Sequence, residues 1–220
     1  MARFTPETVA KKITDTKFLP LFNYADAEVC KQVIKASYTA GLRAFELTNR
    51  DTFALEVFRQ LAPWVEKECP EMTFGAGTIL DGETADAFID AGADFIVAPV
   101  FDKDTGKACK KRNIAWIPGC FSPTEIYKAA KSGASLVKLF PAGTVGPDYV
   151  KHILAPMPFL RIIVTGGVNF DESTIRSWLG SGVAAMGIGG SVFSKERISA
   201  KDYTAIEHEL KKIAGFTKQG

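Results

Sequence analysis

The chain has 220 residues, of which 46% are hydrophobic and 24% are charged, a composition typical of a soluble globular protein. Its formal net charge of +2, from 27 basic and 25 acidic residues, creates no overall field that would select nucleic acid or an anionic membrane. Apolar runs such as residues 95–101 are far shorter than the roughly 20 residues of a membrane helix. The first residues lack the apolar middle of a signal peptide, so we expect a cytoplasmic protein.

Short β-type runs alternate with amphipathic helical runs along the whole chain. A helix is predicted first, over residues 6–16. The eight predicted strands are 17–22, 44–48, 72–77, 95–99, 114–119, 136–140, 162–167 and 184–190. These runs are apolar at consecutive positions, which is typical of parallel strands covered on both faces.

Helical patterns lie between the strands, for example at 27–41, 82–92 and 122–133, and each ends on a glycine suited to a C-terminal cap. Ser-Pro-Thr-Glu at 122–125 matches a capping box. Eight strand–helix repeats with short connections predict a (β/α)8 TIM barrel, a single domain over residues 1–220. The extra helix at 6–16 is expected to cover the bottom of this barrel.

The cysteines and histidines form no ligand pattern. The four cysteines lack Cys-x-x-Cys spacing, and the two histidines, His152 and His208, lie in helical patterns. We expect free thiols and no metal or cofactor.

Chemically unusual residues follow the predicted strands, where a TIM barrel places its catalytic groups. Glu46, Thr48 and Arg50 alternate along the second strand, so all three are expected on one side of it. Lys138 interrupts an apolar run, where desolvation disfavours its charged form and a neutral amine can act as a nucleophile. The alternative is that Glu46 forms an interior ion pair with Arg50 or Lys138.

Paired glycines end the last two predicted strands, in "VTGGV" (164–168) and "GIGGS" (187–191). TIM barrels frequently bind phosphate at this place through backbone N–H groups. The pattern predicts an anion site, although the glycines can also serve only tight turns.

The motifs "ELTNR", "GAGT", "IPGCFSPTE", "KLFPA", "TGG" and "GGS" occur in this order over nearly the whole chain. Together they resemble the 2-keto-3-deoxy-6-phosphogluconate (KDPG) and 4-hydroxy-2-oxoglutarate (KHG) aldolases. The resemblance implies a metal-independent class I aldolase on a (β/α)8 barrel, usually a homotrimer, that releases pyruvate and an aldehyde.

The resemblance also implies roles for individual residues. Lys138 would form the Schiff base, and Glu46 would transfer protons. Residues implied at the pyruvate end are Arg50, Thr78, Pro99, Phe140 and Thr165; residues implied at the phosphate are Gly166, Gly167, Gly190 and Ser191. An iminium on Lys138 would accept the electrons released when the C3–C4 bond of a 2-keto-4-hydroxy acid breaks.

Some positions depart from the pattern of the family. Val100 and Phe101 are expected to give the pocket a less polar wall, and Asn23 and Tyr24 stand where some relatives have an arginine or an aliphatic residue. The aldehyde product therefore stays open between glyceraldehyde 3-phosphate, glyoxylate and the product of another sugar-acid stereoisomer. A phosphate-binding isomerase or epimerase, and a non-catalytic sugar-acid binding protein, remain alternative functions.

Three apolar side chains are candidates for the surface of the outer helices, where they would pack within the subunit or face a neighbour. They are Phe121, Trp178 and Phe193.

Overall fold

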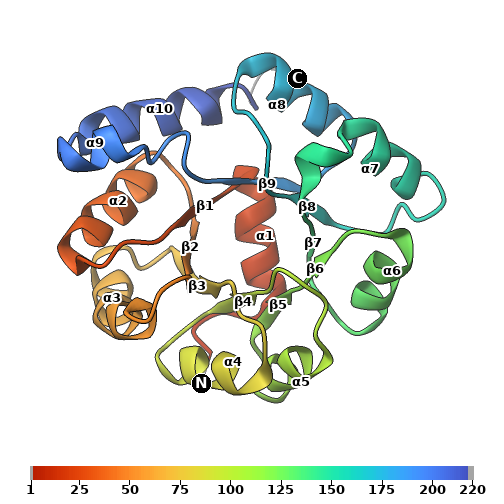
Figure 1. Ribbon diagram of the computed structural model, residues 1–220, viewed down its shortest axis with the longest axis horizontal. Helices are drawn as coiled ribbons and strands as arrows, with labels where there is room; N and C mark the ends of the chain where they lie inside the picture. The colour runs from red at the N-terminus through yellow and green to blue at the C-terminus, as the bar shows by residue number, and fades with distance from the viewer. Residues whose placement is uncertain (1, 218–220) are drawn as a thin grey trace.

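The computed structural model describes residues 2–217, so Met1 and residues 218–220 of the predicted domain lie outside the described residues. A ring of parallel strands is surrounded by helices (Figure 1). The strands are β1 (Phe18–Phe22), β2 (Ala44–Thr48), β3 (Thr73–Gly77), β4 (Phe95–Val97), β5 (Ala115–Ile117), β6 (Gly119–Cys120), β7 (Val137–Leu139), β8 (Ile162–Val164) and β9 (Ala185–Ile188). Their order in the sheet is β5-β4-β3-β2-β1-β9-β8-β7-β6.

The ring closes through β5 and β6, which are two halves of the strand predicted at 114–119. Pro118 separates them because proline has no backbone N–H to donate to a ladder. β5 pairs with β4, and β6 pairs with β7. The Pro118 carbonyl still accepts from the amide of Lys138 at 2.9 Å. The predicted eight-stranded barrel is thus confirmed.

Helices follow the strands and cover the outside of the ring. They are α1 (Pro6–Thr16), α2 (Ala27–Thr39), α3 (Ala54–Glu68), α4 (Gly82–Asp90), α5 (Lys103–Lys111), α6 (Pro123–Lys131), α7 (Pro147–Leu154), α8 (Glu172–Gly180), α9 (Lys195–Ser199) and α10 (Tyr203–Gly215), with a short 3-10 helix η1 (Ala142–Thr144). The glycines predicted to close α2, α4 and α6 adopt positive φ just beyond each helix end, and the capping box of α6 is present.

Two core layers follow from the alternation of side chains along the strands. On β7, Val137 and Leu139 point outward into the large cluster between strands and helices, whereas Leu136 belongs to the smaller cluster inside the barrel. On β8, Ile163 is the inward residue. Lys138 lies between two outward residues and therefore points into the barrel.

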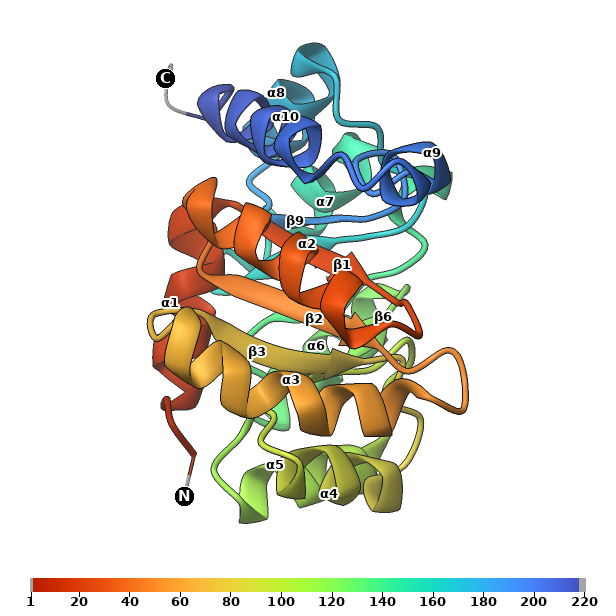
Figure 2. The same cartoon turned by 90° about the vertical axis from the view of Figure 1, so that its left-hand side faces the viewer.

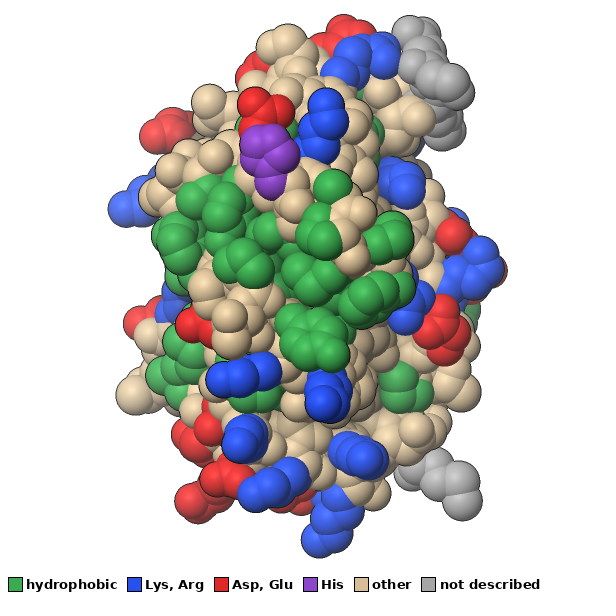
Figure 3. All heavy atoms as spheres, turned by 90° about the vertical axis from the view of Figure 1, so that its right-hand side faces the viewer, with side chains coloured by type: hydrophobic (Ala, Val, Ile, Leu, Met, Phe, Trp, Pro, Cys, Tyr) green, Lys and Arg blue, Asp and Glu red, His purple; other side chains and the backbone are tan. Residues whose placement is uncertain are grey.

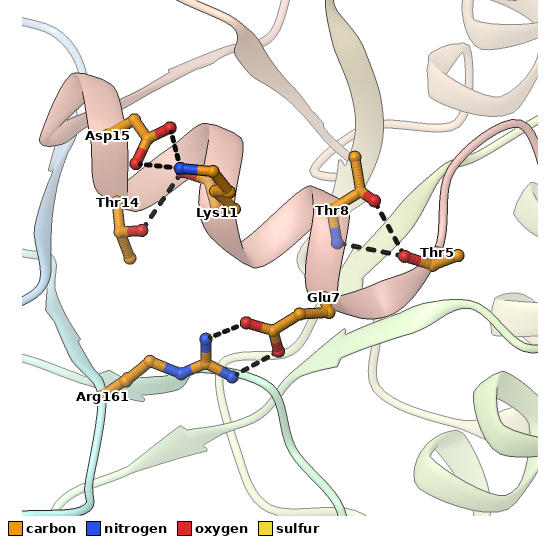
Figure 4. A network of polar contacts seen from close by, with 7 residues as sticks. All are labelled: Thr5, Glu7, Thr8, Lys11, Thr14, Asp15 and Arg161. Carbon is orange, nitrogen blue, oxygen red and sulfur yellow. Dashed lines mark hydrogen bonds and ion pairs between the residues drawn. The ribbon is translucent and has the colours of Figure 1, made fainter.

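Helix α1 closes the bottom of the barrel, as predicted. Val9, Ala10 and Ile13 are fully or almost fully buried and pack into the inner cluster. Figure 2 shows α1 at the end of the barrel opposite the tips of the strands. Arg161 donates two hydrogen bonds to the carboxylate of Glu7, at 2.7 and 2.9 Å (Figure 4). Because exposed ion pairs of this kind contribute at most about 1 kcal/mol, the apolar face dominates the docking of α1.

Several predicted strands extend beyond the observed ones at their C-terminal ends. The strand predicted at 162–167 ends at Val164, because Gly166 and Gly167 adopt positive φ and turn the chain over the barrel mouth. The strand predicted at 184–190 likewise ends at Ile188. Gly166, Gly167 and Gly190, which the predicted strands include and the observed ones do not, are part of the candidate site.

The three apolar surface candidates have different environments. Trp178 and Phe193 are buried in the core between strands and helices, and Phe121 is 40% exposed. Among the helices of residues 2–217, none combines the length and the apolar character needed to span a membrane.

Candidate active site

A cavity of about 370 Å³ opens at the C-terminal ends of the strands. All eleven predicted site residues line it: Glu46, Arg50, Thr78, Pro99, Lys138, Phe140, Thr165, Gly166, Gly167, Gly190 and Ser191. They come from six different strands or the loops directly after them. The parallel barrel brings them together because all of its strands end at the same rim.

Lys138 occupies the middle of β7 and points into the cavity with a relative exposure of 7%. Its Nζ lies 5.2 Å from the centre of the Phe140 ring, which comes from the next inward position of the same segment. Within residues 2–217, Lys138 forms no ion pair with a carboxylate. The amine is therefore sheltered from bulk water and is not neutralised by a direct contact.

Glu46 enters the cavity from β2, on the other side of the barrel, with a relative exposure of 2%. Burial raises the pKa of its carboxyl above the ordinary value, and the positive charges of Lys138 and Arg50 offset only part of this shift. Lys138 and Arg50 thus both attract the charged form of Glu46, but within the described residues neither forms an ion pair with it. The interior ion pair considered as an alternative is absent from this part of the chain.

Arg50 follows the end of β2, and its exposed side chain reaches the cavity rim. Like Lys138, it has no carboxylate partner within the described chain. A guanidinium that is free to donate paired N–H bonds suits a carboxylate ligand.

Thr78 carries an unusual backbone conformation directly after β3. Its φ of 62° lies in the left-handed region, which a β-branched residue rarely adopts. Such conformations cost on the order of 1–3 kcal/mol and concentrate at functional sites. The turn brings Thr78 to the cavity wall beside Glu46 and Arg50.

The loops after β8 and β9 present backbone donors to the cavity. Within residues 2–217, the amides of Gly166, Gly167, Gly190 and Ser191 donate no hydrogen bond to protein acceptors. Gly166 needs its positive φ, and an added Cβ would lie 2.9 Å from the Phe140 ring. Unpaired N–H groups of residues that line a cavity are suited to bind an anion.

Sequence reasoning missed four lining residues, Leu21, Val168, Phe170 and Gly187, whereas Gly189 belongs to the predicted glycine pair. Strand register identifies some of them, because Leu21 pairs with Glu46 across β1 and β2. Gly187 precedes the predicted glycine pair by one inward step of β9. Val168 and Phe170 carry no chemical signal in the sequence that separates them from ordinary loop residues.

Thr48 shares the inner side of β2 with Glu46, because Phe45 and Leu47 pack into the outer cluster. Its hydroxyl donates to the Phe22 carbonyl at 3.4 Å, and it does not line the cavity.

One expectation needs correction. Val100 and Phe101 do not form the cavity wall, because the chain turns outward after Pro99 and Phe101 packs on Trp116, with ring centres 5.5 Å apart.

Asn23, one of the departures at the end of β1, lies outside the cavity lining. Its amide nitrogen donates to the carboxylate of Asp51 at 2.6 Å. It therefore links the loops that follow β1 and β2.

The four cysteines are free, as predicted, and all four are buried. Burial raises the pKa of Cys30, Cys109 and Cys120 to about 12, so these thiols stay protonated at neutral pH. In residues 2–217, no cluster of three or more histidine, cysteine, aspartate or glutamate side chains is arranged to hold a metal ion.

The family model for KDPG and KHG aldolases matches residues 9–209. The 2-dehydro-3-deoxy-phosphogluconate aldolase of Treponema pallidum (strain Nichols) is 30% identical over 94% of this chain and 98% of its own. The KHG/KDPG aldolase of Escherichia coli (strain K12) is 29% identical over 91% and 92%. The solved structure of the 2-keto-3-deoxy-6-phosphogluconate aldolase of Zymomonas mobilis ZM4 with 3-phosphoglycerate aligns with a TM-score of 0.81 at 25% identity, over 98% and 97% of the two chains.

Proposed function

The chain belongs to the KDPG and KHG aldolase family, and we propose that its cavity cleaves a 2-keto-4-hydroxy acid through a Schiff base on Lys138. As a member of this family it is a carbon–carbon lyase that releases pyruvate and an aldehyde. The observation that carries the proposal is a sheltered lysine, without an ion-pair partner in the described chain, in one cavity with an unpaired carboxyl.

Lys138 acts as the nucleophile. Its neutral amine attacks C2 of the keto acid, and the carbinolamine loses water to form an iminium. When the C3–C4 bond breaks, its electron pair moves to C3 and into the iminium, which becomes a neutral enamine. Protonation of C3 and attack of water on the regenerated iminium then release pyruvate and the free amine.

Glu46 moves the protons in this sequence. Its carboxylate takes the proton of the C4 hydroxyl as the aldehyde forms, and the resulting acid returns a proton to C3 of the enamine. One group can serve in both directions when its pKa lies closer to the working pH, and burial raises the pKa of Glu46 in that direction. General acid–base help of this kind contributes about 10²–10⁴-fold.

The remaining lining residues orient the substrate. Arg50 binds the C1 carboxylate, and Thr78, Pro99, Phe140 and Thr165 surround the pyruvate portion. At the far end, the unpaired amides of Gly166, Gly167, Gly190 and Ser191 receive a distal phosphate. The Zymomonas mobilis relative holding a phosphorylated three-carbon acid supports this choice.

The Schiff base predicts a covalent adduct. Borohydride reduction in the presence of pyruvate is expected to add a reduced pyruvate to Lys138, detected by mass spectrometry of the peptide. Lys138→Met should lose both the adduct and pyruvate release in an assay coupled to lactate dehydrogenase. The matched variant Lys128→Met, on the exposed side of α6, should keep both. An isomerase or a non-catalytic binding protein would form no adduct and release no pyruvate.

The phosphate site predicts a substrate-dependent effect of Gly190→Ala. An added Cβ at Gly190 meets no protein atom within 4 Å, and its φ is not positive, so only a ligand should meet the new methyl group. Losing hydrogen bonds to a charged group should raise KM for 2-keto-3-deoxy-6-phosphogluconate by about 10- to 100-fold. KM for unphosphorylated 4-hydroxy-2-oxoglutarate should change little.

Gly180→Ala is the matched control, because this glycine at the end of α8 also has open space around it. Its kinetics should equal those of the unaltered chain. A uniform effect of Gly190→Ala on both substrates would contradict the phosphate assignment.

A homotrimer and a cytoplasmic location are parts of the same proposal. Apolar side chains gather on the face that carries α6 and α7 (Figure 3). Tyr127 on α6 is 47% exposed and Phe159, before β8, is 64% exposed. They line a groove of about 380 Å³, and an exposed apolar surface of this kind marks an interface in soluble proteins. We assign the subunit contact to this face.

Phe159→Glu should therefore convert a trimer into smaller species, measured by size-exclusion chromatography with light scattering. Leu80→Glu, at another highly exposed apolar position, after β3, should leave the trimer intact. A trimer that survives Phe159→Glu unchanged would exclude this face as the contact.

A further inference from the structure

Gly77 ends β3 directly before Thr78 of the cavity lining, although glycine weakens a strand interior. Its φ is not in the left-handed region, so its backbone conformation is open to alanine. The need for glycine must therefore come from space.

That space is filled by the end of the Glu46 side chain. Thr48 of β2 pairs with Gly77 of β3, two residues beyond Glu46, and Glu46 leans along its strand over this position. A Cβ built on Gly77 would overlap the carboxylate carbon and Oε1 of Glu46 and would lie 2.7 Å from its Cγ. Real Cβ atoms essentially never approach another heavy atom so closely.

Nothing else on the described chain holds the carboxyl. Glu46 forms no hydrogen bond and no ion pair there, so its position depends on packing. The bare Cα of Gly77 supplies the surface on which the carboxyl rests. With a side chain at position 77, the carboxyl would have to swing toward the open cavity, where the charge of Lys138 attracts it.

We propose that Gly77 is a positioning residue, whose missing side chain seats the Glu46 carboxyl beside the wall and keeps it from pairing with Lys138. The catalytic part of this inference rests on the proposed aldolase function. The contact between the two residues does not, and it can be tested without activity.

The kinetic test compares Gly77→Ala with Gly75→Ala, two residues earlier on the same strand. In Gly77→Ala, kcat should fall by at least about tenfold, within the range of general acid–base help, and the acidic limb of the pH–rate profile should move to lower pH. Gly75→Ala displaces the Phe95 ring instead of a carboxyl, so it should lower the melting temperature without moving that limb. An unchanged kcat and profile in Gly77→Ala would overturn the proposal.

A thermodynamic cycle on folding stability covers the case in which Gly77→Ala folds poorly. Gly77→Ala should lower the midpoint of urea unfolding when Glu46 is present and should have little effect in a Glu46→Ala background. An equal loss in both backgrounds, or a double variant that fails to fold, would overturn the proposed contact. If the cycle shows coupling but no keto acid is cleaved, the proposed function fails and the seating of Glu46 stands.

Discussion

Two ionisable side chains, Lys138 and Glu46, share the interior of one barrel without touching. In a medium of low polarity the charged forms of two such groups attract strongly, and a direct ion pair would occupy both. The structure separates them by placing them on β7 and β2 and by leaving the cavity between them. The proposed chemistry depends on this separation, since the amine must be free to attack and the carboxyl free to exchange a proton.

Burial of Glu46 makes the stability of the fold depend on pH. Because burial raises the pKa of Glu46 in the folded chain, the fold favours the protonated carboxyl. The stabilisation by the protonated form is complete below the pKa of the unfolded chain and is lost as the pH rises through the raised folded value, so that the buried carboxylate costs stability at higher pH. Apolar packing elsewhere offsets this cost, including the inner cluster that α1 closes from below. The barrel thus keeps its reactive residues at one end and the smaller, inner apolar cluster at the other.

Patterns in the sequence were sufficient for the architecture and for most of the cavity. Alternating runs and glycine caps indicate the barrel, and each predicted site residue lies on a strand or directly after one, so the strands bring them together at their common rim. Such patterns do not predict which way the chain and its side chains turn after the end of a strand. Phe101 is expected in the wall of the pocket, but it packs on Trp116 outside the pocket. The sequence also does not show that the Thr48 hydroxyl donates to the Phe22 carbonyl. The close contact of the Glu46 carboxyl with Gly77 depends on packing between two strands, and the pattern of residues along the sequence does not show it.

The most direct test is a pH titration of Glu46. Its protonation is monitored by infrared difference spectroscopy, which compares the unaltered chain with Glu46→Gln. We predict a protonated carboxyl band that persists above the ordinary glutamate pKa of about 4.3. A carboxyl that ionises at or below that value would show that water or a cation stabilises its charge, and it would contradict the buried, unpaired state of Glu46 on which the proposed chemistry depends.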